Sequence, residues 1–183
     1  GSFKGKKIFE PKDNKTRPLK DLAKESIFNI IEHSNKFNTQ LIDSNILDLF
    51  SGVGSFGIEC LSRGCKKVVF VENYSGVLPI LKKNLLSLKL VKKYEILEND
   101  IYNDKSLSKL HDKFDIIFLD PPFKDKNLNK FLLKLINFEI LNKNGLIIIH
   151  RHKNDDDKFS EKFKVVDEKK YGISKISFLT NLN

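Results

Sequence analysis

The chain has 183 residues and a mass of 21.2 kDa, the usual size of a single domain with its own hydrophobic core. Hydrophobic residues make up 40% of the chain and charged residues 31%, which excludes a disordered protein, and no apolar run approaches the roughly 18 residues of a membrane span. The first residues carry charges with no apolar segment behind them, unlike a secretory signal, so we expect a cytoplasmic protein. Cys60 and Cys65 lack the spacing and histidine partners of a zinc site, so we expect structural thiols and no bound metal.

Positive charge is concentrated near the N-terminus. The formal net charge is +9, and residues 1–24 hold eight basic side chains against three acidic ones. Such a run is either a solvated tail or an arm that binds the phosphates of a polyanion. We expect a basic arm over residues 1–20, followed by a single domain over residues 21–183. The candidate phosphate-binding residues are Lys4, Lys6, Lys7, Arg17, Lys20 and Lys24.

The first half of the predicted domain alternates helices with short apolar runs. A 3.6-residue period predicts a helix over residues 21–32, with Asp21 as its N-cap. Residues 46–50 are typical of a buried parallel strand, and the glycines of residues 52–57 end it. A helix over residues 56–62, stopped at Arg63-Gly64, then leads to a second strand over residues 67–71.

The second half continues this alternation and then changes character. A leucine stripe predicts a helix over residues 77–90, and further strands are expected over residues 94–97, 114–119 and 145–149, with a helix over residues 128–138 between the last two. Residues 162–166 and 173–179, separated by Gly172, are typical of a hairpin. The whole pattern predicts an α/β fold: a doubly wound, mostly parallel seven-stranded sheet with a C-terminal antiparallel hairpin.

Acidic residues lie at or near the carboxyl ends of four predicted strands. Asp48 lies in the first, Glu72 ends the second, and Asp100 and Asp120 follow the third and fourth. Ligands of doubly wound sheets bind beyond the carboxyl ends of the strands, at the point where the strand order reverses. We therefore expect these four acids to line one binding site.

A glycine-rich loop, Gly52-Val53-Gly54-Ser55-Phe56-Gly57, joins the first strand to the next helix. This G-x-G-x-x-G pattern has three interpretations: a dinucleotide site, a site for S-adenosylmethionine (SAM), or a turn that only packs a strand against a helix. Asp48 favours SAM, because a carboxylate attracts the ammonium of the methionine tail and repels a pyrophosphate. Asp100 suits the adenine amino group, with Ile101 against the ring, and Glu72 suits the ribose hydroxyls in either cofactor. The expected cofactor-binding residues are Asp48, Phe50, Ser51, Gly52, Gly54, Phe56, Gly57, Glu72, Asn73, Asp100 and Ile101.

The sequence Asp120-Pro121-Pro122-Phe123 follows the fourth predicted strand. On its own it could be a turn that ends the strand. Beside a SAM-type loop it predicts a catalytic site, because an amino group on a base ring is a poor nucleophile until its lone pair is freed. Hydrogen bonds from that amine to the Asp120 carboxylate and the Pro121 carbonyl would do so, with the prolines fixing the backbone and Phe123 stacking on a base that is flipped out of its helix.

Five segments carry a resemblance to a known family. They are Phe3-Lys4-Gly5-Lys6-Lys7-Ile8 with Thr16-Arg17-Pro18, Lys24-Glu25-Ser26-Ile27-Phe28-Asn29, LDLFSGVGSFGIECLSRG over residues 47–64, and FDIIFLDPPF over residues 114–123. Over nearly its whole length the chain resembles the 16S ribosomal RNA guanine-N2-methyltransferases of the RsmD type. Two positions depart from that pattern: Leu19 stands where Thr is common, and His150 where Glu is common.

The resemblance implies a Rossmann-like SAM-dependent methyltransferase fold. It implies SAM bound around Asp48, Gly52, Gly54, Glu72 and Asp100, with residues 120–123 holding the amino group of guanine. It also implies that Arg17, the neighbouring lysines and the helix of Phe28 lie over the cofactor pocket and grip RNA. The expected partner is 16S rRNA or an assembling small ribosomal subunit, and we expect a monomer.

Other functions fit part of the sequence. The same pocket could methylate adenine N6 of DNA or RNA, or the side-chain amide of a protein glutamine, although such enzymes often have Asn at the position of Asp120. A nucleotide-binding oxidoreductase, or an RNA-binding protein without catalytic activity, would also fit a Rossmann-like scaffold. Neither explains residues 120–123.

Overall fold

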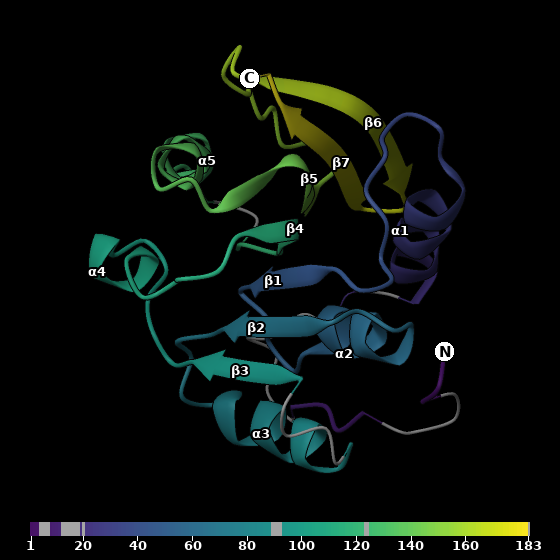
Figure 1. Cartoon of the computed structure of the whole chain (residues 1–183), viewed down its shortest axis with the longest axis vertical. Helices are drawn as coiled ribbons and strands as arrows, with labels where there is room; N and C mark the ends of the chain where they lie inside the picture. The colour runs from purple at the N-terminus through teal and green to yellow at the C-terminus, as the bar shows by residue number, and fades with distance from the viewer. Residues whose placement is uncertain (4–7, 12–18, 20, 89–92, 123–124, 183) are drawn as a thin grey trace.

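Seven strands form one sheet in the computed structural model, which describes all residues except 4–7, 12–18, 20, 89–92, 123–124 and 183 (Figure 1). The strand order is β3-β2-β1-β4-β5-β7-β6. The first five strands are parallel, and β7 pairs antiparallel with both β5 and β6. The strands are β1 (Asn45–Leu49), β2 (Lys67–Val71), β3 (Tyr94–Leu97), β4 (Phe114–Leu119), β5 (Leu141–His152), β6 (Phe163–Tyr171) and β7 (Ser174–Asn181).

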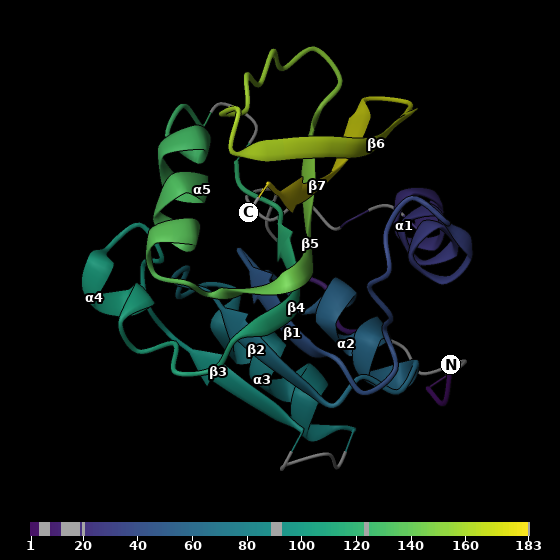
Figure 2. The same ribbon diagram turned by 45° about the horizontal axis from the view of Figure 1, so that its top comes forward.

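Helices cover both faces of the sheet. The described helices are α1 (Asp21–His33), α2 (Ser55–Ser62), α3 (Leu78–Leu86), α4 (Asp104–Leu107) and α5 (Leu128–Asn137). Figures 1 and 2 show α4 and α5 on one side of the sheet and α1 and α2 on the other. This arrangement confirms the predicted doubly wound α/β fold with a C-terminal antiparallel hairpin. None of the helices in the described part of the chain is long and apolar enough to cross a membrane.

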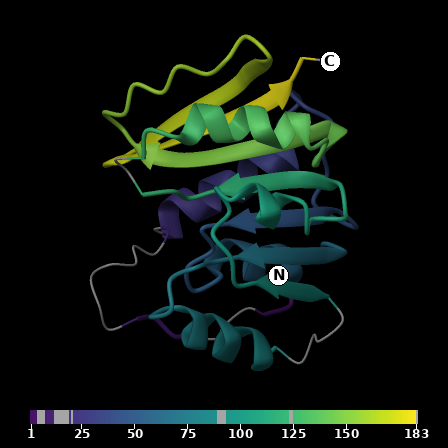
Figure 3. The same cartoon turned by 90° about the vertical axis from the view of Figure 1, so that its left-hand side faces the viewer.

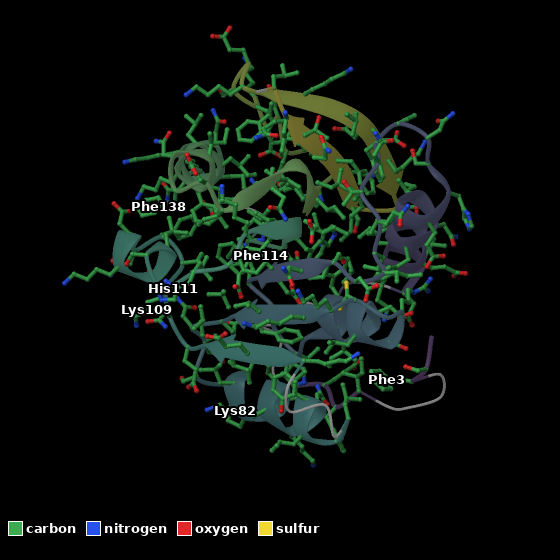
Figure 4. The ribbon with its side chains drawn as sticks, in the orientation of Figure 1. Phe3, Lys82, Lys109, His111, Phe114 and Phe138 are labelled. Atoms are coloured by element: carbon green, nitrogen blue, oxygen red, sulfur yellow. The ribbon has the colours of Figure 1, made fainter. Side chains whose placement is uncertain are left out.

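Two hydrophobic cores follow from the alternation of side chains along the strands. One core lies beneath α1, α2 and α3, where the rings of Phe28 and Phe56 stack at 5.3 Å and those of Phe56 and Phe118 at 4.1 Å. The other lies beneath α4 and α5 and contains Phe114, which points inward in Figure 4, and Phe131. Because parallel strands are covered on both faces, they can be apolar at nearly every position.

The predicted bounds are wrong mainly for the C-terminal strands. β5 was expected over residues 145–149 but runs from Leu141 to His152, because Leu141 pairs with Phe114 and residues up to His152 pair with β7. β6 also continues to Tyr171 through Asp167–Lys170, a charged stretch without an apolar pattern. Charged residues are common on edge strands, where they discourage pairing with other chains. The four-residue helix α4 was not predicted, and α3 ends at Leu86 rather than at residue 90.

The two cysteines are free thiols within the core. Cys60 lies in α2, and Cys65 follows the turn at Gly64, which has the positive φ of 94° expected at the end of a helix. Burial raises the pKa of both thiols, that of Cys65 to about 12. A high thiol pKa suppresses the reactive thiolate, so both cysteines are structural, as expected.

Candidate active site

The carboxyl ends of the parallel strands meet at one edge of the sheet. In Figure 3 the strands run side by side with their arrowheads at the same edge. A cavity of about 360 Å³ lies there, bounded by the residues that follow β1, β2 and β4. It is lined by Leu19, Asp48, Phe50, Ser51, Gly52, Val53, Ser55, Phe56, Glu72, Asn73, Tyr74, Val77, Phe118, Asp120, Pro121, Pro122 and His150.

The glycine loop turns sharply between β1 and α2. Phe50 and Gly52 have positive φ angles of 57° and 54°, and Gly54, the N-cap of α2, has 84°. A positive φ strains a bulky residue such as Phe50, by roughly 1–3 kcal/mol. Such strain persists only where neighbours enforce it, and here Ser51 is fixed by hydrogen bonds from its N–H and its hydroxyl to the Val71 carbonyl, both 3.2 Å. The loop is therefore held in a preset shape.

The three glycines have different roles. Gly52 lines the cavity, whereas Gly54 and Gly57 do not. A Cβ on Gly54 would lie 2.7 Å from Leu81 Cδ1, and a Cβ on Gly57 would lie 2.4 Å from the Phe70 ring. Gly54 and Gly57 are thus needed where α2 packs on β2 and α3, and Gly52 is the glycine at which a ligand can approach the backbone.

Asp48 is buried at the base of the cavity, 1% exposed. Its Oδ2 accepts a hydrogen bond of 3.0 Å from the N–H of Gly57, in the first turn of α2. Burial raises the pKa of Asp48 well above its ordinary value, and the nearby carboxylates of Asp120 and Glu72 raise it further, against the lowering effect of the Gly57 N–H. A cation bound in this cavity would stabilise the ionised form of Asp48.

Glu72 connects the turn after β2 to the glycine loop. Its Oε2 accepts from the N–H of Gly52 at 2.8 Å, and its Oε1 accepts from Asn73 and Tyr74 at 2.9 and 2.8 Å. Each carboxylate oxygen has two lone pairs, so Oε1 is saturated by its two donors and Oε2 retains capacity for one further donor. Binding of ribose hydroxyls by Glu72 stays a prediction consistent with this geometry.

Asp100 and Ile101 lie beyond the lining of the cavity. The Asp100 side chain is exposed and accepts from the N–H of Tyr102 at 3.0 Å, while Ile101 is 3% exposed and belongs to the core beneath α4 and α5. Their expected contacts with an adenine stay a prediction. Phe50 lines the cavity, and the centroid of its ring lies 5.6 Å from that of Tyr102, which follows Ile101.

Asp120 faces the cavity at the end of β4 and is held from behind. Its Oδ1 lies 2.8 Å from Nδ1 of His150, and Nε2 of His150 lies 2.8 Å from the Ser174 hydroxyl. Among the described residues no other group donates to the Asp120 side chain, so Oδ2 is available to a ligand. Both ring nitrogens of His150 therefore have a partner, and one of these partners is the candidate catalytic carboxylate.

The backbone after Asp120 is fixed by a buried arginine. Arg151 donates from Nη1 to the Pro122 carbonyl at 2.9 Å and from Nη2 to the Asp125 carbonyl at 3.0 Å. Its Nε lies 3.2–3.3 Å from carboxylates of Asp155 and Asp157, which compensate its charge. Pro121 and Pro122 both line the cavity, and Phe123 lies outside the described residues.

The region before α1 reaches the same cavity. Leu19 lines it, and the Lys24 ammonium lies 3.2 Å from the Ser55 hydroxyl beside the glycine loop and 3.1 Å from Asp21. Phe28 is fully buried in the core, so its part in α1 is packing. Of the other arm residues expected to bind phosphates, Lys4, Lys6, Lys7, Arg17 and Lys20 lie outside the described residues.

Several site residues were missed by sequence reasoning. Ser174 and Arg151 are polar residues in predicted strands or beside them, and only the pairing of β5 with β4 and β7 places them at the site. Apolar Val53, Val77 and Phe118 carry no signal that separates cavity lining from core. The one signal in the sequence was His150 itself, which stands where Glu is common in the family that the chain resembles.

The charge of the cavity decides between the possible cofactors. Asp48, Glu72 and Asp120 line it, and no lysine or arginine is found among its described lining residues. A pyrophosphate would be repelled there, whereas the sulfonium and ammonium groups of SAM would be attracted. Fold and cavity together define the class of protein: a SAM-dependent methyltransferase.

Comparison with known proteins gives the family within that class. The chain belongs to the family described as "Conserved hypothetical protein 95", whose model matches residues 1–180. It is 33% identical over 178 residues to the ribosomal RNA small subunit methyltransferase D of Haemophilus influenzae, covering 94% of this chain and 87% of that protein. It is 34% identical over 151 residues to the protein of the same name from Buchnera aphidicola, covering 82% and 73%.

Solved structures share the fold. The crystal structure of HI0767 from Haemophilus influenzae has a TM-score of 0.69 and 33% identity, covering 89% of this chain and 98% of that one. The structure of yhhF from Escherichia coli has a TM-score of 0.79 at 24% identity, covering 99% and 94%.

Proposed function

We propose that this protein transfers the methyl group of SAM to the exocyclic N2 of a guanine in 16S rRNA. The observation that carries the proposal is the Asp120 carboxylate, which is fixed at 2.8 Å from His150 and faces the cavity that Asp48 and Glu72 line. Relatives named ribosomal RNA small subunit methyltransferase D support the choice of RNA.

Asp120 is suited to activate an amino group. The lone pair of such a nitrogen is delocalised into the base. Acceptors that take hydrogen bonds from its two N–H groups would hold the nitrogen nearer to tetrahedral geometry and so free the lone pair. Oδ2 of Asp120 can accept one N–H, and the Pro121 carbonyl, which receives no hydrogen bond from the described residues, can accept the other. The same carboxylate can take up the proton that the nitrogen loses.

The remaining residues would hold the cofactor, which supplies an electrophilic methyl group when bound. Asp48 would balance its ammonium, Glu72 would accept from its ribose hydroxyls, and the backbone at Gly52 would lie close to it. The other residues of this proposed site are Phe50, Ser51, Phe56 and Asn73 along the cavity, Gly54 and Gly57 in support of the loop, and Asp100 and Ile101 toward the adenine.

The arm over residues 1–20 would grip RNA through its basic side chains, with Lys24 beside the cavity, and Phe123 would stack on the flipped base. The partner would be 16S rRNA or an assembling small ribosomal subunit, met in the cytoplasm by a monomer. The domain proper would be residues 21–183.

The second candidate is methyl transfer to another amine, such as adenine N6 or a glutamine amide. It uses the same cavity and differs in the acceptor alone. A nucleotide-binding oxidoreductase is disfavoured by the three acids of the cavity. An RNA-binding protein without catalysis would have no use for the hydrogen-bonded pair of Asp120 and His150.

Identification of the methylated nucleoside tests the proposal. Small-subunit particles from cells lacking this activity are incubated with the protein and tritiated SAM, digested, and separated by chromatography. Labelled N2-methylguanosine is the expected product. Labelled N6-methyladenosine, or label in protein, would move the function to the second candidate. Asp120→Ala should abolish the label, and Asp112→Ala, which removes an exposed acid paired with Lys67, is the matched control.

A further inference from the structure

We propose that His150 and Ser174 are positioning residues that fix the carboxylate of Asp120 for methyl transfer. The inference rests on the proposed function in one respect, the assignment of Asp120 to the acceptor amine. It adds two residues from the C-terminal half of the sheet, His150 of β5 and Ser174 of β7, to a reaction otherwise assigned to the loops after β1 to β4.

Strand register brings these three residues together. β4 and β5 run parallel with Leu119 opposite Ile149, so the next positions, Asp120 and His150, are also neighbours. On the other side of β5, His150 lies opposite Ile176 of the antiparallel strand β7, and Ser174 is two residues from Ile176, on the same face. Fixed strands, rather than mobile loops, therefore set the distance from the serine to the carboxylate.

The hydrogen bonds define which atom carries the imidazole proton. A carboxylate has no proton to donate, so the contact of 2.8 Å between Asp120 Oδ1 and His150 Nδ1 requires a hydrogen on Nδ1. In a neutral ring Nε2 is then the acceptor, and the Ser174 hydroxyl donates to it at 2.8 Å. The Asp120 carboxylate thus selects the tautomer, and the Ser174 hydroxyl satisfies Nε2 and fixes the orientation of the ring.

The three hydrogen-bonded residues differ in their exposure. His150 is 6% exposed and Ser174 is 3% exposed, whereas the Asp120 side chain is 20% exposed toward the cavity. Water cannot replace Ser174 at Nε2 without entering the core, so the far side of the ring is held by the protein alone. Oδ1 of Asp120 is engaged by the ring, and Oδ2 is the oxygen presented to a substrate. Buried polar partners of this kind keep a catalytic side chain in the geometry that the reaction requires.

Two amide replacements of the histidine separate this role from simple packing. In His150→Asn the amide nitrogen can lie where Nδ1 was and donate to Asp120, whereas in His150→Gln it reaches toward the position of Nε2. We expect His150→Gln and His150→Leu to lower the single-turnover methyl-transfer rate by about 10- to 100-fold, the cost typical of a misplaced catalytic group. His150→Asn should recover most of that loss, and SAM affinity should be unchanged in all three.

Ser174→Ala tests the hydrogen bond on the far side of the imidazole, with Ser177→Ala as its matched control. Ser177 is a buried serine of the same strand whose hydroxyl donates to Glu168 at 3.0 Å, away from the cavity. We expect Ser174→Ala to lower the transfer rate severalfold and Ser177→Ala to leave it unchanged at similar thermal stability. Equal rates for His150→Gln and the wild type, or equal losses for the two serine variants, would overturn the inference.

The tautomer can be measured without any turnover. In the ¹⁵N spectrum of the wild-type imidazole at a pH where His150 is neutral, we expect the hydrogen on Nδ1, the less common form of a free histidine. Asp120→Ala, which removes the acceptor, should shift the ring toward the Nε2–H form, whereas Ser174→Ala should leave the hydrogen on Nδ1. A wild-type ring with hydrogen on Nε2 overturns the inference whatever the substrate is, whereas an Nδ1–H ring together with no methylated guanosine would contradict the proposed function alone.

Discussion

The buried carboxylate of Asp48 serves binding at the expense of stability. Burial and two neighbouring acids raise its pKa, so ionising it in the empty fold is unfavourable, although a bound ammonium would reverse that penalty. The side chain lies between the Gly57 N–H and the cavity, where a neutral residue of the same shape could keep the first contact and lose the second.

Asp48→Asn should therefore separate the two effects. We expect it to weaken SAM binding by about 10- to 100-fold, the loss of a charge-assisted hydrogen bond, in calorimetric titration. The ligand-free variant should melt at a higher temperature than the wild type at neutral pH. Because the folded-state pKa is raised, the wild type loses stability as pH rises from the ordinary carboxyl range through that pKa, so the advantage should vanish in acid. A variant that is less stable at neutral pH would contradict this account.

At the scale of elements, the junction of α2 with β2 depends on a position without a side chain. Gly57→Ala would bring a Cβ within 2.4 Å of the Phe70 ring and 2.8 Å of Val68, both buried. Overpacking of this kind costs roughly 1–3 kcal/mol, measured as the free energy of unfolding in urea. Combining it with Phe70→Leu should recover part of the loss, because the smaller side chain makes room. Strict additivity of the two substitutions would show that the clash is not the cause.

The turn between β4 and α5 depends on the guanidinium of Arg151. Arg151→Lys keeps a positive charge beside Asp155 and Asp157 but cannot donate to the Pro122 and Asp125 carbonyls together. We expect faster amide exchange in the turn and a lower methyl-transfer rate, with little change in SAM affinity. Lys67→Arg, an exposed position paired with Glu95 and Asp112, is the control for a basic substitution. Unchanged exchange in the turn would exclude this role for Arg151.

At the scale of the whole molecule, the arm should make RNA binding sensitive to salt. The N-terminal segment also docks on the domain, since the Phe3 N–H donates to Ser62 at 2.9 Å and Phe9 exchanges hydrogen bonds with the Asn84 amide; Figure 4 marks Phe3 near the edge of the molecule. Replacing Lys4, Lys6, Lys7 and Arg17 by Gln is therefore cleaner than deletion. The logarithm of RNA affinity should then fall less steeply with the logarithm of salt, by roughly 0.7 per lost phosphate contact.

A control for this prediction uses lysines far from the arm. Lys82, labelled on α3 in Figure 4, and Lys164 on β6 are exposed. Their replacement by Gln should alter the salt dependence less than the arm substitutions do. Equal effects of the two sets would mean that net charge alone, rather than the arm, attracts RNA.

The sequence predicted the parts of the fold that repeat a pattern. Alternating apolar runs and helical stripes located the parallel strands β1 to β4 within about a residue, because burial on both faces makes them apolar nearly throughout. It also identified Asp48, Glu72 and Asp120 correctly as lining one cavity. The charged strand β6 and the extension of β5 were missed, because their residues are determined by strand pairing rather than by local preference. His150, Ser174 and Arg151 belong to that second group, since contacts between residues distant in sequence define them.

Calorimetric titration of SAM into the wild-type protein and into Asp120→Ala tests the central claim most directly. We expect SAM to bind both proteins with closely similar affinity, because the cofactor would be held by Asp48, Glu72 and the glycine loop, while Asp120 is reserved for the acceptor. Failure of SAM to bind the wild-type protein, or loss of binding in Asp120→Ala at unchanged fold, would contradict it.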